Sequence, residues 1–165
     1  MALDDLAPFI GTWDMEARFP PERGVPGVEG EVTTTFEWVL DAAFLLQRSN
    51  APAPIPQGLC IIGEDPATGA YTQHYFDSRG VARLYAMTFD GASWTLERLR
   101  PDFTPLDFSQ RYIGTFEDDG NTIRGAWEFR NDGEPWQTDF ELSYYRRSGM
   151  IDQGRPGSPG GGSLG

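Results

Sequence analysis

"YTQHYFDSRGVARLYAMTFDGASWTLERLR", residues 71–100, decides the fold class of this chain. Large residues with apolar bodies occupy most alternate positions of residues 81–89 and again of residues 94–98. A period of two turns one face of a strand toward a core and the other toward water. Asp90–Gly91 separates the two runs, and Asp-Gly is among the strongest signals for a tight hairpin turn. The segment therefore predicts two antiparallel strands.

The same alternation recurs on both sides of this hairpin. We expect further strands in residues 11–19, 28–40 and 44–50, two around the turn at 64–69, and three in 108–147. Asp41–Ala42 is predicted as a turn, and Leu3, Leu6 and Phe9 lie at the spacing of a short helical turn or plug. About ten strands in meander order predict an all-β antiparallel sheet. Because closure removes exposed edges, we expect a barrel.

Composition and charge narrow the functional classes. Residues 1–147 are predicted to form one domain, and the Gly/Ser/Pro-rich tail 148–165 is predicted to be disordered. A net charge of −12 argues against nucleic acid and anionic membranes as partners. The N-terminus is acidic and holds no long apolar run, so we expect a cytoplasmic protein. Cys60 is the one cysteine and lies in the apolar run "LCIIG", which predicts a buried core thiol.

Several motifs resemble the calycins, the superfamily of lipocalins, fatty-acid-binding proteins and nitrobindins. An N-terminal turn leads into "GTW" at 11–13, and "YYRR" at 144–147 resembles the calycin closing strand. The run from Tyr75 through "YYR" is similar to a bacterial family of calycin-like domains of unknown function. The resemblance implies a barrel with an internal cavity for a small apolar or amphipathic molecule. It also implies that Arg146 or Arg147 packs over Trp13.

Haem is not expected as a cofactor. The resemblance to nitrobindins would imply a histidine ligand near the C-terminal end, but "ELSYYRR" has none and His74, the only histidine, lies mid-chain. The nitrobindin signature "GxGxGxYP" is also missing after Trp13. No metal site is predicted, because His74 has no second histidine, no cysteine pair and no H-E-x-x-H motif beside it.

The alternation of inward and outward positions along each strand, here called strand parity, suggests a ligand site inside the barrel. If the bulkier apolar face of each strand points inward, three arginines from three strands point inward with it: Arg48, Arg83 and Arg98. Guanidinium groups suit carboxylates and phosphates, so these arginines are predicted to hold the anionic head of an otherwise apolar ligand. The alternative is that they reach the rim or pair with acidic side chains. The same parity places further residues inside the barrel, and we expect Tyr85, Gln110, Tyr112 and Trp127 to join the ligand site and Trp136 to face inward.

Three classes of function remain open at this point. The first is a binding protein for a small apolar or amphipathic molecule, with an anionic one expected and a homodimer left open. The second is an isomerase- or cyclase-type enzyme, for which His74, Asp77, Tyr112 and Glu128 are the acid–base candidates. The third is a barrel filled by its own aromatic side chains that serves as an interaction module. A barrel fold alone does not separate them.

Overall fold

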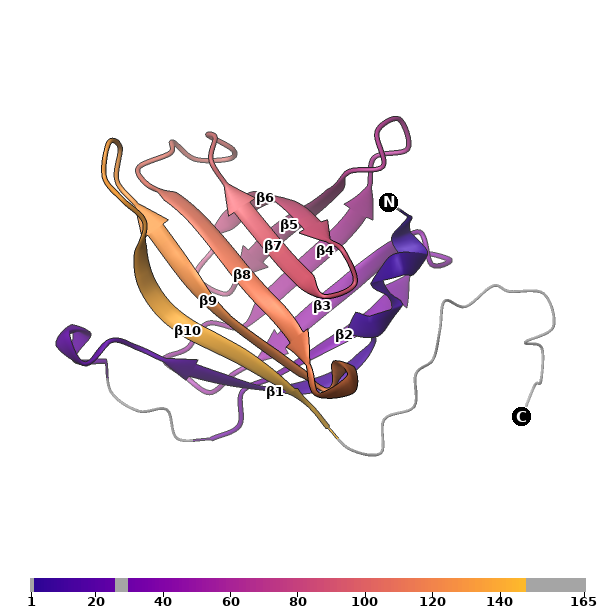
Figure 1. Cartoon of the computed structure of the whole chain (residues 1–165), viewed down its shortest axis with the longest axis horizontal. Helices are drawn as coiled ribbons and strands as arrows, with labels where there is room; N and C mark the ends of the chain where they lie inside the picture. The colour runs from indigo at the N-terminus through magenta and orange to yellow at the C-terminus, as the bar shows by residue number, and fades with distance from the viewer. Residues whose placement is uncertain (1, 26–29, 148–165) are drawn as a thin grey trace.

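Each strand of the barrel pairs with the next one along the chain, and the last strand pairs with the first. The computed structural model describes residues 2–25 and 30–147; the predicted disordered tail lies outside them. All ten predicted strands are present, in the closed order β1-β10-β9-β8-β7-β6-β5-β4-β3-β2 (Figure 1). Their bounds are β1 Gly11–Arg18, β2 Thr33–Val39, β3 Phe44–Asn50, β4 Gly58–Glu64, β5 Tyr71–Asp77, β6 Ala82–Phe89, β7 Ser93–Arg98, β8 Ser109–Glu117, β9 Thr122–Arg130 and β10 Gln137–Arg146. The all-β barrel prediction is confirmed.

Three short 3-10 helices join the strands: η1 Leu3–Phe9, η2 Pro21–Arg23 and η3 Asp118–Gly120. The first, η1, closes one end of the barrel. Leu3, Leu6 and Phe9 are buried, and the Phe9 ring lies 4.9 Å from Phe89 and 5.0 Å from Trp94. The predicted plug is thereby confirmed.

The first-strand tryptophan is held as the calycin resemblance implied. The guanidinium of Arg146 lies 4.1 Å from the centre of the Trp13 ring, and the Trp13 indole N–H donates to the Phe9 carbonyl at 2.9 Å. Arg146 also donates to the carbonyl of Ile10 at 2.6 Å. Arg147, the other candidate, pairs instead with acidic side chains on the outer surface. These contacts fasten the plug and the first strand, β1, to the last strand, β10.

Tyr112 fills the barrel between β8, β9 and β10. Its ring lies against Gly114 and Gly125, where a Cβ atom would collide with the tyrosine, and its hydroxyl donates to the Leu142 carbonyl at 2.9 Å. The glycines therefore leave the space that this side chain occupies. Together with Trp94, 5.0 Å away, Tyr112 forms the solid part of the interior above the plug.

Strand β3 reverses the predicted parity. Leu45 and Gln47 are buried, whereas Phe44 and Arg48 are exposed. The reason is register: Gln47 lies opposite Phe36 of β2, and residues directly opposite in an antiparallel pair share a face of the sheet. The prediction that Arg48 points inward is therefore wrong.

Trp136 is also misplaced by the sequence prediction. It precedes β10, and a bulge between Thr138 and Phe140 breaks the alternation that had assigned it to the interior. The guanidinium groups of Arg111 and Arg130 lie 4.1 Å and 4.7 Å from the centre of its ring.

Candidate functional site

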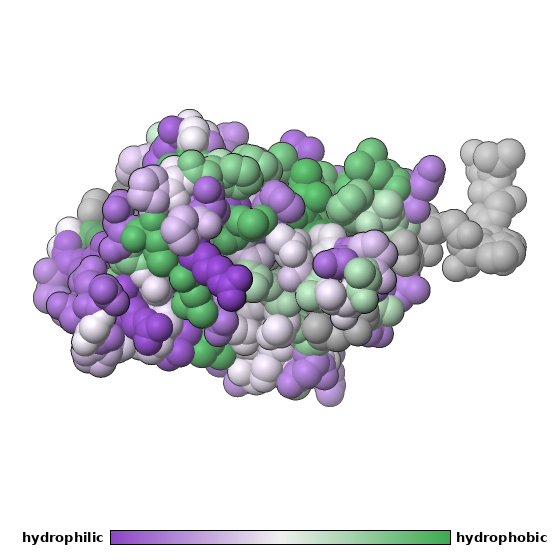
Figure 2. Space-filling view, turned by 90° about the horizontal axis from the view of Figure 1, so that it is seen from above, coloured by the Kyte–Doolittle hydropathy of each residue, from purple (hydrophilic) through white to green (hydrophobic). Residues whose placement is uncertain are grey.

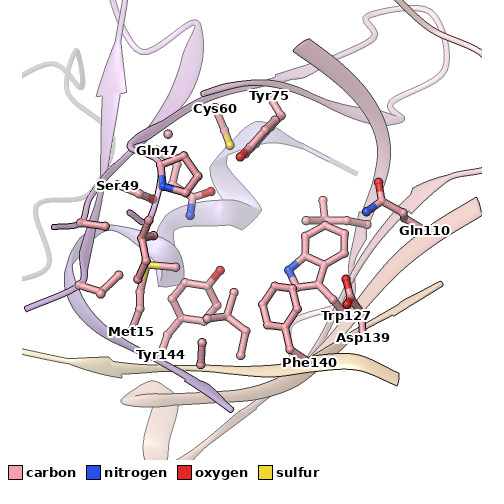
Figure 3. Close-up of a pocket in the computed structure, with 18 of the residues that line it drawn as sticks. Met15, Gln47, Ser49, Cys60, Tyr75, Gln110, Trp127, Asp139, Phe140 and Tyr144 are labelled. Carbon is pink, nitrogen blue, oxygen red and sulfur yellow. The ribbon is translucent and has the colours of Figure 1, made fainter. Parts of the chain in front are cut away.

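A cavity of about 820 Å³ occupies the barrel on the side away from the plug (Figure 3). Its volume falls within the roughly 300–1,000 Å³ of small-molecule sites. The interior is therefore not filled by its own aromatic side chains, which removes the premise of the third functional class. The chain segments that border its outer end are residues 19–25, 30–32, 51–58 and the neighbourhoods of Arg79 and Phe108.

Aromatic rings form much of the cavity wall. Tyr75, Tyr85 and Trp127 make a continuous series, with ring centres 6.4 Å apart for the two tyrosines and 5.5 Å for Tyr85 and Trp127. Phe140 and Tyr144 continue the wall, and Figure 3 shows the Tyr144 hydroxyl pointing into the space. Burial raises the pKa of Tyr144, so this group is a neutral hydroxyl at any physiological pH. The wall suits an apolar body with few polar atoms.

Two buried polar atoms belong to cavity-lining residues and have no partner. Within the described part of the chain, neither Gln73 Oε1 nor Trp94 Nε1 makes a hydrogen bond, although both residues are almost fully buried. An unsatisfied buried polar atom costs about 1–3 kcal/mol. Gln73 Oε1 is an acceptor and Trp94 Nε1 is a donor. The buried amide of Gln47, by contrast, donates from Nε2 to the Thr34 hydroxyl at 3.2 Å.

Arg83 is the predicted arginine that the structure places on the cavity wall. Its guanidinium donates to Gln110 Oε1 and lies 5.9 Å from the centre of the Phe108 ring. Arg79, the other arginine that lines the cavity, is paired with Asp77 at 2.6 Å. Among the described residues Arg83 forms no ion pair with a carboxylate. It is a cavity cation whose charge the barrel itself does not neutralise.

The other two predicted arginines do not reach the cavity. Arg48 lies on the outer face of β3, as described above. Arg98 does point inward and is only 3% exposed. However, its Nε and Nη2 groups donate hydrogen bonds to the Asp102 carboxylate at 2.7 Å and 2.9 Å. The Arg98 side chain also donates to Thr104 and is absent from the cavity lining. The alternative reading, pairing with an acidic side chain, is correct for Arg98.

The remaining predicted binding residues divide in the same way. Tyr85, Gln110 and Trp127 line the cavity, and the Tyr85 hydroxyl lies 3.4 Å from Gln110 Oε1. Burial raises the pKa of Tyr85, and the nearby Arg83 opposes part of that rise. Tyr112 does not line the cavity, because it occupies the packed space over the glycines of β8 and β9.

The four acid–base candidates are not brought together. His74 is exposed on the outer face of β5, and Glu128 lies on the outer face of β9, paired with Arg111 at 2.9 Å. The hydroxyl of Tyr112 is committed to a backbone carbonyl. His74 and Glu128 therefore cannot act on a molecule inside the barrel.

Asp77 lies at the end of β5 beside the cavity. It accepts hydrogen bonds from the Tyr75 hydroxyl at 2.8 Å and from Arg79 Nη2 at 2.6 Å. Burial acts to raise the pKa of Asp77, but the hydrogen bonds from Arg79 and Tyr75 outweigh it and lower the pKa to about 2. The group is an ionised acceptor at neutral pH and holds the Tyr75 ring in the cavity wall.

Several cavity residues carried no signal that sequence reasoning used. Gln73 was missed because both faces of "YTQHYF" are mixed, yet it lies opposite two inward residues, Ile62 and Tyr85. Cys60 is buried as predicted, but it lines the cavity, and burial raises the pKa of its thiol to about 12. Cross-strand pairing, unlike composition, would have identified the positions.

The described residues contain no group of three or more His, Cys, Asp or Glu side chains arranged for a metal ion. They also contain no helix of the length and hydropathy needed to cross a bilayer.

Comparison with known proteins supports the fold. No family model and no curated protein matches this chain. The crystal structure of Rv2717c from M. tuberculosis is similar, with a TM-score of 0.56 and 18% sequence identity, over 88% of this chain and 96% of that one. At that identity the likeness establishes the fold alone, which the strand order describes as a closed antiparallel β-barrel.

Proposed function

We propose that the barrel binds a small amphipathic anion, with its acidic group at Arg83 and its apolar body against the aromatic wall. The observation that carries the proposal is the state of Arg83. The chain has 25 acidic residues, yet this cavity-lining guanidinium has none of them as a partner in the described structure. A cation on a partly desolvated wall is costly without a counter-charge.

The surroundings of Arg83 suit a carboxylate or a similar planar acid. A guanidinium has five N–H donors in a fixed fork, and Gln110 accepts from one nitrogen only, Nη1. The remaining N–H groups can donate to both oxygens of a carboxylate. The Phe108 ring lies 5.9 Å from the guanidinium, and the Tyr85 hydroxyl lies 3.4 Å from the same Gln110 oxygen. Sulfonates and phosphates share the same recognition chemistry.

The deeper part of the cavity adds no charged partner for the ligand. Gln73 Oε1 and Trp94 Nε1 have no hydrogen-bond partner in the described structure, but neighbouring atoms cover both, so a molecule in the cavity does not reach them unless these side chains rearrange. No described carboxylate lies unpaired beside them, so this end of the cavity favours neutral groups. The ligand class is therefore an apolar molecule with one acidic end.

Titration with 8-anilinonaphthalene-1-sulfonate, an aromatic anion, tests the proposal. We expect saturable binding with one site per chain. Charge-assisted hydrogen bonds contribute about 1.5–3 kcal/mol, and partial exposure reduces this, so Arg83→Gln should weaken binding about tenfold. Arg48→Gln, an arginine of the outer face, serves as the control and should leave the affinity unchanged. Equal affinities in all three proteins would contradict the assignment of Arg83.

Competition by an unlabelled pair separates the charge from the apolar body. Dodecanoate should displace the probe more effectively than dodecanol from the wild type. The preference should vanish in Arg83→Gln, because both competitors then offer only the same chain. If dodecanol competes as well as dodecanoate in the wild type, the cavity binds apolar molecules without an anion site.

A further inference from the structure

The outer face of β3, β4, β5 and β6 is largely apolar. Its central row runs across all four strands as Leu46, Ile61, His74 and Leu84, each directly opposite the next. On one side of this row, Leu59 of β4 lies directly opposite Phe76 of β5. On the other side of the row, the Phe44 ring covers Gly63. We call this surface the β3–β6 face. Figure 2, which looks onto the wall that includes β5 and β6, shows hydrophobic residues gathered there.

Three aromatic or aliphatic side chains of the face are partly exposed. Phe44 and Phe76 are each 38% exposed and Leu84 is 37% exposed, whereas Leu46 is buried beneath its neighbours at 8%. The adjacent loop adds Phe103, which is 59% exposed and follows Asp102, whose carboxylate accepts a hydrogen bond from the Leu84 backbone at 3.0 Å. The largest apolar patch on a monomeric protein is often functional, so this face is a candidate for an interaction surface.

The β3–β6 face also differs from the rest of the barrel in charge. Each of the other six strands carries at least one outward carboxylate: Asp14, Glu37, Glu97, Glu117, Glu128 and Glu141. The four strands of the β3–β6 face carry none. These strands have two acidic residues, Glu64 and Asp77. Each follows an inward-pointing residue, Ile62 or Tyr75, by two positions and therefore lies on the inner face of the sheet. In a chain of net charge −12, carboxylates are absent from one wall only.

We propose that the β3–β6 face is a homodimer interface, on which a second copy of this chain packs about a twofold axis. A second copy carries the same charge of −12, so it can approach without carboxylate repulsion only through a wall that lacks acids. A twofold interface must be complementary to itself. Arg48 at one end of the face and Glu37 on the flanking strand β2 supply one charge of each sign. Neither forms an ion pair within the described chain, so each is available to its counterpart in the partner.

The size of the face sets the strength of the association. Four strands about 4.8 Å apart and five residues along each, with their side chains, cover about 20 Å by 20 Å, or about 400 Å². Stable complexes bury about 800 Å² on each partner. The face is about half that size, so with its flanking loops it supports a dimer that dissociates on dilution.

Sedimentation velocity over about 1 µM to 1 mM protein tests this inference. The wild-type mass should rise from 18.4 kDa toward twice that value with concentration. Leu84→Glu places a carboxylate at the centre of the face and should remain monomeric throughout. Ile113→Glu is the matched control, because Ile113 is 41% exposed on the outer face of β8, where acids are already present, and it should behave as the wild type.

Phe76→Glu provides a second variant of the face, and circular dichroism confirms that each variant is folded. Loss of the dimer in a folded Leu84→Glu or Phe76→Glu variant supports the proposal. A wild type that stays at 18.4 kDa up to about 1 mM overturns it, and so does a dimer that survives both substitutions. The outcome is independent of the cavity, because neither residue lines it.

Discussion

Replacing Asp102 with asparagine tests the assignment of Arg98 as a structural residue. The two side chains are 3% and 2% exposed, and two of the guanidinium nitrogens contact the carboxylate. Asp102 also accepts from the backbone of Leu84 at 3.0 Å and of Thr104 at 3.1 Å, so it fastens the loop after β7 to β6. In Asp102→Asn the buried guanidinium loses its counter-charge. Removing one partner of such a pair costs about 3–5 kcal/mol, a large part of the 5–15 kcal/mol that stabilises a typical domain.

The effect should depend on pH in a defined direction. Hydrogen bonds from Arg98 lower the pKa of Asp102, and burial opposes them only in part. A carboxyl whose pKa is lower in the folded state stabilises the fold above its unfolded pKa of about 3.9 and loses that contribution as the pH falls. Wild type and Asp102→Asn should therefore differ most at neutral pH and converge in strong acid.

Urea denaturation followed by tryptophan fluorescence measures the difference at pH 7 and in acid. Glu117→Gln is the control, because it breaks the exposed pair of Arg124 and Glu117 and should cost less than about 1 kcal/mol. Binding of the anilinonaphthalene probe to folded Asp102→Asn should be unchanged. A loss of stability no larger than in Glu117→Gln would refute the buried pair. Weakened probe binding with stability intact would return Arg98 to the ligand site.

Three further predictions concern the backbone and the cavity thiol. Gly125→Ala should lower the free energy of unfolding by about 1–3 kcal/mol in urea denaturation, because the new Cβ collides with Tyr112. Leu40→Gly should raise it by about 0.5–1 kcal/mol, since Leu40 has φ 53°, where glycine is unstrained, whereas the same change at extended Ile113 should lower it. Cys60 should resist Ellman's reagent at pH 8 until urea unfolds the chain, because burial raises the pKa of its thiol to about 12; fast reaction of the native protein would contradict this.

The hairpin of β6 and β7 could be predicted from sequence because every local signal agreed. The Asp90 carboxylate accepts from the backbone of Ala92 at 2.9 Å, and Gly91 has φ 94°, which glycine adopts without strain. Alternation on both sides then fixed which residues point inward. Strand β3 offered no such agreement, since "FLLQRSN" has leucines on both faces. Only its pairing with β2, where Leu45 lies opposite Trp38, decides its orientation.

The candidate site was predicted in part for the same reason. Parity correctly placed Arg83, Tyr85, Gln110 and Trp127 on the cavity wall. Parity also placed Arg98 inward, but the neutralising Asp102 lies in a loop whose path back over β6 has no periodic signature. The outer face of β3 is predicted as core because apolar residues at alternate positions do not show, in sequence alone, whether they point into the barrel or away from it.

Native mass spectrometry of the purified protein, before and after denaturation, tests the central claim most directly. We expect an excess mass on the native chain above 18.4 kDa that denaturation removes, or one that appears as a one-to-one complex on adding dodecanoate. The released or added molecule should carry an acidic group, and Arg83→Gln should retain much less of it. A native mass that equals the denatured mass in every case, with dodecanoate present, would contradict a ligand-binding cavity.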